Sequence, residues 1–140
     1  MDLFEELVMF KLTRNPHVFV SPQYSVMDES GKEWSCPDFV LLNFRSRTVS
    51  VVEVNTAADP KGLEQKVADR QKQWFTKLRS QLERNAVVDA SWALRIDVFI
   101  RHQAVPKFKE TFGQENDVSI HNLDEIGFPW HWEWSSHPTD

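Results

Sequence analysis

Hydrophobic and polar residues follow a helical spacing at the start of the chain and a strand-like spacing from about residue 17 onward. Asp2 and Glu5 have the sequence pattern of a helix capping box, and apolar residues recur behind them as far as Asn15-Pro16, which predicts a first helix. Three segments rich in β-branched and aromatic residues follow, separated by two turn-like sequences. They predict strands over residues 17–27, 34–44 and 48–55.

The second half of the chain alternates between helical and strand-like patterns. Asp59-Pro60 is a typical helix start, because proline suits a first helical turn and an acidic residue suits a helix N-terminus. The helix that it opens is predicted to run to about residue 85. The remaining predicted elements are a strand over 93–100, a short helix over 105–112 and a fifth strand over 118–123. The core order is α-β-β-β-α-β, followed by an acidic extension.

The composition is typical of one globular domain, because 140 residues, 41% of them hydrophobic and 26% charged, are enough to enclose a core. We expect a single domain over residues 1–140, with its core in about 1–101 and an acidic, aromatic C-terminal extension over 102–140. No apolar run approaches the roughly 20 residues that a membrane helix needs, and the N-terminus is acidic where a signal peptide would be basic. An intracellular, cytoplasmic protein is therefore expected. The single Cys36 excludes an internal disulfide and a zinc site built of cysteines.

The formal net charge of −5 is unevenly distributed along the chain. Residues 110–140 hold seven acidic residues and no Lys or Arg, so residues 1–109 carry sixteen basic residues against fourteen acidic ones. Residues 61–84 include Lys61 and Lys72 and hold seven basic residues against three acidic ones. Such a segment can bind the phosphates of a nucleic acid, or it can simply be the solvated face of a helix.

Two acidic residues lie among the apolar strand patterns: Asp38 precedes one apolar run and Glu53 ends the next. If the turn at residues 45–47 joins these strands as an antiparallel hairpin, the start of one lies beside the end of the other. Asp38 and Glu53 are then neighbours, with Glu53 and Asn55 on one face of their strand. Adjacent carboxylates repel each other unless a cation lies between them, and Mg²⁺ commonly binds a few carboxylates together with water and phosphate oxygens.

This pattern resembles the PD-(D/E)XK nuclease superfamily, also called restriction-endonuclease-like. Pro37-Asp38 matches the first element of the family motif, and Glu53-Val54-Asn55 matches the second except for its last residue. A glutamate of the first helix, Glu5 or Glu6, would supply a further acid. The predicted order of elements also matches, over roughly residues 1–101. The resemblance implies an α/β fold in which a central mixed sheet is flanked by helices.

The resemblance also implies an activity and a cofactor. A metal-dependent nuclease of this family would hold one or two Mg²⁺ or Mn²⁺ ions on Asp38, Glu53 and the carbonyl of Val54. It would hydrolyse phosphodiester bonds in DNA or, as a less favoured substrate, RNA. Of the two helical acids, Glu6 is the expected metal ligand, because the capping box already accounts for Glu5.

Asn55 departs from the family pattern, which has lysine at this position. A neutral amide cannot stabilise a hydroxide or a developing phosphate charge as an ammonium can. Lys66 on the following helix is the expected substitute, ahead of Lys61 and Lys32, because that helix usually borders the metal site in the family.

Two further residues of this helix are candidates for the site. In the RecB-like branch of the superfamily this helix carries a glutamine, and Gln71 would take its place in orienting water or phosphate. At 100° per residue Gln71 falls within an apolar face, where it must find a hydrogen-bond partner, either at the site or on the backbone of the core. That face is defined by Leu63, Val67, Trp74 and Leu78. Arg70, at its edge, would bind phosphate or form an ion pair.

The acidic residues have purely structural alternatives. Asp38 can bond the backbone of a turn, and Glu53 can pair with Arg45 or Arg47. Asn55 would then mark lost chemistry, and the protein would be an inactive nuclease-fold module that binds protein or nucleic acid, or a subunit of a larger complex. An active enzyme would favour a homodimer, because cutting two strands with one small domain needs two sites.

The C-terminal extension places three tryptophans at alternating positions, so that they share one face if the chain is extended. They are Trp130, Trp132 and Trp134. Such a stripe can close the core or a dimer contact, or it can stack on bases.

Overall fold

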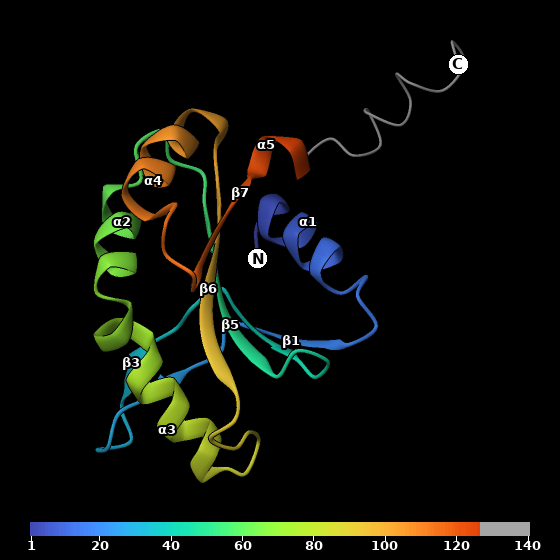
Figure 1. Ribbon diagram of the computed structural model, residues 1–140, viewed down its shortest axis with the longest axis vertical. Helices are drawn as coiled ribbons and strands as arrows, with labels where there is room; N and C mark the ends of the chain where they lie inside the picture. The colour runs from blue at the N-terminus through green and yellow to red at the C-terminus, as the bar shows by residue number, and fades with distance from the viewer. Residues whose placement is uncertain (127–140) are drawn as a thin grey trace.

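A computed structural model of the chain describes residues 1–126 (Figure 1). The strands are β1 (Val18–Pro22), β2 (Val26–Met27), β3 (Glu33–Ser35), β4 (Phe39–Asn43), β5 (Thr48–Asn55), β6 (Ala93–Ile100) and β7 (Val118–Asn122). The helices are α1 (Leu3–Leu12), α2 (Lys61–Ala68), the π-helical turn η1 (Gln71–Phe75), α3 (Thr76–Arg84), the 3-10 turn η2 (His102–Ala104), α4 (Val105–Phe112) and α5 (Leu123–Ile126).

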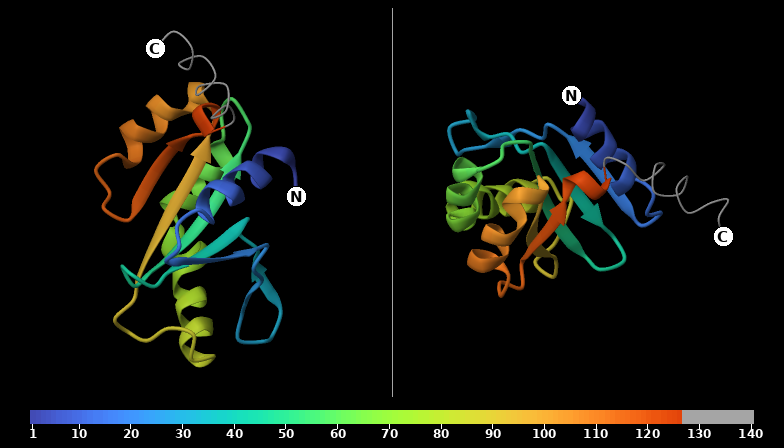
Figure 2. Two further views of the ribbon diagram at one scale, coloured as in Figure 1. Left: turned by 90° about the vertical axis from the view of Figure 1, so that its right-hand side faces the viewer. Right: turned by 90° about the horizontal axis from the view of Figure 1, so that it is seen from above.

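The central sheet has five strands in the order β1-β4-β5-β6-β7. Its first three strands are antiparallel to one another, whereas β5, β6 and β7 run parallel. Helices α1 and α5 cover one face, and α2, α3 and α4 cover the other (Figures 1 and 2). The expected α/β class, with a mixed central sheet flanked by helices, is confirmed.

Two hydrophobic cores fill the spaces between these layers, because successive residues of a strand point to opposite faces. Val49 and Val51 of β5 pack with Trp74, Leu78 and their neighbours in the larger core. Val52 of the same strand packs with residues from α1 and β4 in the smaller core. Strand β5 is therefore buried on both of its faces.

The two long strands expected over residues 17–27 and 34–44 are each divided in two. Gln23 adopts a positive φ of 49°, which turns the chain after β1, and its N–H donates to the carbonyl of Asp38 at 2.8 Å. Pro37, which has no N–H to give to a ladder, separates β3 from β4. As a result, β2 and β3 form a separate two-stranded sheet.

The helix expected over about residues 60–85 is present but contains the π-helical turn η1. A π turn leaves a carbonyl without its usual helical donor. Here the indole N–H of Trp34 donates to the carbonyls of Lys72 and Gln73, each at 3.1 Å. The small sheet is thereby attached to the helix, and the Lys77 ammonium lies 4.5 Å from the centre of the Trp34 ring.

Residues beyond 101 belong to the core, contrary to the expected boundary. Strand β7 pairs in parallel with β6, and Phe108, Phe112 and Leu123 are buried in the two cores. The three alternating tryptophans lie outside the described residues. Among the helices of residues 1–126, none combines the length and the apolar character that crossing a bilayer requires.

Candidate acidic site

Asp38 and Glu53 lie side by side, as the hairpin expected from the sequence requires. The register of β4 and β5 pairs Phe39 with Val52, which places the next two residues outward, Asp38 and Glu53, opposite each other. The backbone N–H of Asp38 donates to Oε2 of Glu53 at 2.8 Å. The N–H of Val54 donates to Oδ2 of Asp38, also at 2.8 Å.

These two hydrogen bonds have a local cause. Strand β4 begins only after Pro37, so β5 extends past the end of its partner strand. The N–H of Val54 therefore lacks a partner carbonyl on β4, and the Asp38 carboxylate takes that place. Each carboxylate thus also caps the backbone of the neighbouring strand.

Burial and mutual repulsion hold protons on this pair. Burial raises the pKa of Glu53 to about 8, and the adjacent charge of Asp38 adds to the effect, while the N–H of Asp38 and the charge of Lys66 oppose it. Burial likewise raises the pKa of Asp38 to about 6, with a further contribution from the Glu5 carboxyl. At neutral pH the pair therefore carries about one proton.

Of the two helical acids, Glu5 is the one whose carboxyl acts on the pair, and the expected role of Glu6 as a metal ligand stays a prediction. The Glu5 carboxyl contributes to the raised pKa of Asp38. It simultaneously completes the capping box, accepting from the N–H of Asp2 at 2.8 Å. Glu6 is one position further round α1, and its side chain is exposed. Glu5 therefore both caps helix α1 and acts on the acidic pair.

The donor set suits a hard divalent cation that keeps most of its waters. Asp38 and Glu53 offer adjacent carboxylate oxygens whose repulsion a cation would relieve. Within residues 1–126, however, no three His, Cys, Asp or Glu side chains converge on one metal position. A metal would thus rest on two carboxylates, and the expected contribution of the Val54 carbonyl stays a prediction.

The other expected site residues are dispersed. Lys66 is exposed on α2, yet its charge is near enough to lower the pKa of Glu53. The Asn55 side chain accepts from the N–H of Ala57 at 2.9 Å and so closes the turn after β5. Gln71 is exposed, so its expected position on the apolar face was wrong. The glutamine buried on that helix is Gln81, which bonds Met27, Tyr24 and Ser25.

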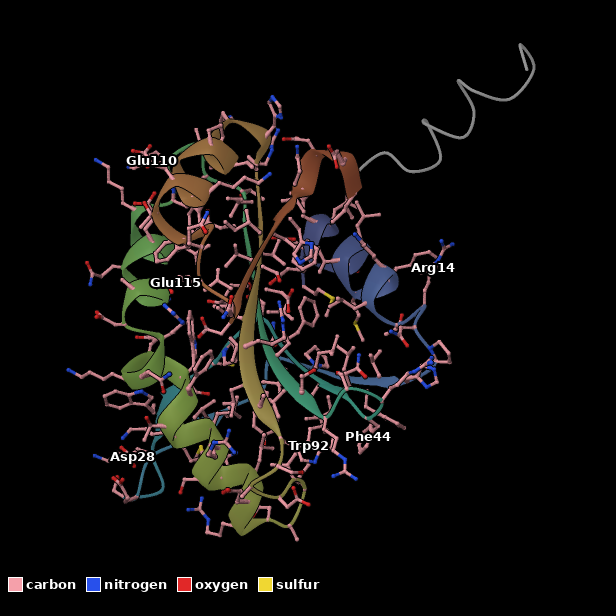
Figure 3. The ribbon with its side chains drawn as sticks, viewed as in Figure 1. Arg14, Asp28, Phe44, Trp92, Glu110 and Glu115 are labelled. Carbon is pink, nitrogen blue, oxygen red and sulfur yellow. The ribbon has the colours of Figure 1, made fainter. Side chains whose placement is uncertain are left out.

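Among the expected phosphate ligands, Arg70 is engaged within the protein. Its guanidinium donates to both carboxylate oxygens of Asp117, at 2.6 and 2.9 Å, and lies 3.7 Å from Glu115, which Figure 3 labels. With a side chain only 15% exposed, Arg70 forms the ion pair that was the alternative to phosphate binding. Lys61 and Lys72 are exposed, and Lys61 lies 3.8 Å from Asp59.

A further half-buried acid was not predicted. Asp97 of β6 accepts hydrogen bonds from the Ser50 hydroxyl, from Arg95 at 3.3 Å and from the His121 ring at 2.9 Å. Burial alone would raise its pKa, but His121, Ser50 and Arg95 together hold the pKa of Asp97 below its ordinary value. The only signal in the sequence was a serine and an aspartate inside two apolar strands.

Comparison with known proteins gave no match: no family model, no curated protein and no solved structure is significantly similar to this chain.

Proposed function

We propose that the protein is a metal-dependent nuclease of the restriction-endonuclease-like type, with DNA favoured over RNA as its substrate. The observation that carries the proposal is the adjacency of Asp38 and Glu53, two half-buried acids whose pKa values are raised by burial and by their neighbouring carboxyl groups. A half-buried acid pair in this condition is costly to maintain. A bound divalent ion would compensate for that unfavourable free energy.

The connectivity of the core supports the proposal of a restriction-endonuclease-like fold. Helix α1 is followed by the antiparallel strands β1, β4 and β5, then by a helical segment and the parallel strand β6. This is the α-β-β-β-α-β order of the resemblance, with the small sheet of β2 and β3 inserted. Strand β7 and helices α4 and α5 extend it.

In the proposed site Asp38 and Glu53 hold Mg²⁺ or Mn²⁺, with the carbonyl of Val54 as a further ligand. Glu5, and not Glu6, supports the proposed site, because its carboxyl helps to raise the pKa of Asp38, but within residues 1–126 it adds no third metal ligand. A bound ion of this kind lowers the pKa of a water and neutralises charge on the scissile phosphate. The protein's part is to hold the carboxylates in place, which the backbone bonds to Asp38 and Glu53 accomplish.

Lys66 is the proposed source of the positive charge that Asn55 cannot give. It acts on Glu53 from the following helix, and its exposed side chain has room to approach a phosphate. Lys61 and Lys72, on the same helical segment, would contact the substrate backbone. Gln71 is also exposed on this segment, and its proposed role is to position phosphate or water.

The test is cleavage of plasmid and oligonucleotide DNA, and of RNA, by the purified chain with Mn²⁺ or Mg²⁺. Asp38→Asn and Glu53→Gln should each abolish cleavage while leaving a cooperative thermal transition. Two matched pairs sharpen the assignment. Glu5→Gln should lower turnover and Glu6→Gln should not, and Lys66→Ala should lower it by about 10² or more while Lys61→Ala has a small effect.

A wild-type protein inert with every divalent ion and nucleic acid would overturn the proposal. One observation favours the second candidate, a non-catalytic nuclease-fold module that binds protein or nucleic acid. Both carboxylates already have a structural task, since each caps a backbone N–H of the adjacent strand. In that case Mn²⁺ would fail to raise the thermal midpoint, because nothing would bind between the two acids.

A further inference from the structure

An open hollow lies at the edge of the sheet, around its outer strand β7. It is an open cavity of about 730 Å³ bounded by residues of α1, α4, β7 and α5. Neither Asp38 nor Glu53 lines it, and Glu5 is also not among its lining residues. Its volume falls in the range of roughly 300–1,000 Å³ that is usual for small-molecule sites.

Apolar side chains form much of the wall of this cavity. They are Leu7, Phe10, Val105, Ile120 and Ile126. Phe10 is 62% exposed, whereas Val8 of the same helix is fully buried. An exposed phenylalanine at the edge of a cavity is a natural surface for an apolar or aromatic ligand.

The charged groups of the cavity are mainly basic. Lys11, Arg14 and Lys109 contribute three cations, against the single acid Glu125. Arg14, at the end of α1 in Figure 3, lies with its guanidinium 4.7 Å from the centre of the Phe10 ring. Within residues 1–126 none of these three cations has an acidic partner in an ion pair.

This gathering of cations runs against the charge of the whole chain, whose formal net charge is −5. Lys61 and Lys107, by contrast, lie within 4 Å of acidic side chains. A cavity that combines an apolar wall with cations that have no acidic partner within residues 1–126 is complementary to a molecule having an apolar body and an acid group. A nucleic-acid backbone would use the cations but leave the apolar wall without a partner.

His121 gives the cavity a polar group of fixed orientation. One ring nitrogen, Nε2, is bonded to Asp97 at 2.9 Å, and the ring stacks on Phe99 with centroids 4.4 Å apart. The ring is thus held on two sides while it lines the cavity. The half-buried Asp97 centre, for which the proposed nuclease has no use, positions this wall.

We propose that this cavity binds a small amphipathic organic acid. The apolar body of the ligand contacts Leu7, Phe10 and Ile120, and its acid group lies among Lys11, Arg14 and Lys109. His121 fixes the wall between these two regions. The site is independent of the nuclease chemistry, so it stands or falls separately from the proposed function.

The test uses the full chain and two fluorescent probes that differ only in an acid group. They are 8-anilinonaphthalene-1-sulfonate and its uncharged parent, N-phenyl-1-naphthylamine. We expect the sulfonate to bind about tenfold more tightly, because only it can use the cations. The triple variant Lys11→Gln, Arg14→Gln, Lys109→Gln should lose about that factor for the sulfonate and keep its affinity for the parent.

Two controls locate the binding. Arg84→Gln removes one positive charge from the exposed end of α3 and should leave both affinities unchanged. Phe10→Ser should weaken both probes, and sulfonate binding should shift the backbone amide NMR signals of Ile120 and His121. Thermal melts of all variants should match wild type, since the substituted side chains are exposed.

Three results would overturn the proposal. The full chain could fail to bind the sulfonate, both probes could bind equally with no response to the triple variant, or Arg84→Gln could weaken binding as much as a single substitution at the cavity. Displacement of the sulfonate by a short DNA strand, with the triple variant abolishing DNA binding, would instead assign the cations to nucleic acid and also count against it.

Discussion

Asp97 and Glu53 are half-buried acids in neighbouring strands of one sheet, and their pKa values move in opposite directions. The parallel register places Glu53 beside Val98 and Asp97 beside Val52, so the two acids face opposite sides of the sheet. The pKa of Asp97 lies below its ordinary value because His121, Ser50 and Arg95 surround it. The pKa of Glu53 rises to about 8, because burial and the charge of Asp38 outweigh the donors around it.

The difference distinguishes an acid whose charge has fixed partners from an acid whose charge is opposed by its surroundings. Burying a charge costs free energy unless fixed partners compensate for it. Asp97 has those partners within the protein and needs nothing else. Asp38 and Glu53 have backbone N–H groups and a proton in place of a cation, and a divalent ion could replace that proton.

Breaking the Asp97 centre should have the largest effect. Asp97→Ala would leave Ser50, Arg95 and His121 without their common acceptor and should lower the free energy of unfolding by about 3–5 kcal/mol. Urea denaturation measures this directly. Asp69→Ala, at an exposed acid of the α2 terminus, should cost less than about 1 kcal/mol. A similarly small loss for Asp97→Ala would mean that the centre is not structural.

Removing the charge of Glu53 should have the opposite sign. Because the folded pKa of about 8 lies above the ordinary value of 4.5, this group's stabilising contribution is complete below pH 4.5 and is lost as the pH rises through about 8. Glu53→Gln cannot ionise and still accepts from the Asp38 N–H. It should therefore exceed wild type by on the order of 2–4 kcal/mol at pH 9 and match it at pH 4.5.

Urea denaturation of both proteins across this pH range decides the matter. If Glu53→Gln is less stable than wild type at every pH, the Glu53 carboxylate stabilises the fold through its hydrogen bonds, and its ionisation does not destabilise the protein. Asp97→Asn gives the comparison, because removing a charge that its neighbours stabilise should destabilise the protein at pH 9.

Metal binding should sharpen the comparison through its pH dependence. If Mn²⁺ binds between Asp38 and Glu53, it must displace the proton that the pair holds between about pH 6 and pH 8. Its affinity should rise by up to about tenfold per pH unit in this window, and about one proton should be released at pH 7. Calorimetry in buffers of different ionisation enthalpy counts that proton. An affinity independent of pH would place the metal elsewhere.

The centre of the acidic site could be predicted from sequence because its geometry is local. One short turn and the alternation of strand side chains were enough to bring Asp38 beside Glu53. Between the two helical acids, Glu6 was preferred for a physical reason. The capping box seemed to account fully for Glu5, whereas its carboxyl accepts from the N–H of Asp2 and also helps to raise the pKa of Asp38.

Contacts distant in sequence could not be predicted in the same way. Arg70 meets Asp117 across 47 positions, and Asp97 meets Ser50 across the same separation. Gln71 was misplaced because the extrapolated helical phase does not hold through the ending of α2 and the π turn. The division of the long strands depends on where Gln23 and Pro37 turn the chain. Residue propensities determine those turn positions only in part.

The π turn over Gln71–Phe75 also bears on how the length of this protein can change. Removing one residue from a regular α-helix rotates everything beyond it by about 100°. A π turn is a helical turn holding one residue more than usual, so loss of the exposed Lys72 would let it become α-helical while Trp74 and Gln81 keep their places. We therefore expect this helix to accept a deletion at the π turn. The deletion would remove the hydrogen bond that the Trp34 indole N–H donates to the carbonyl of Lys72.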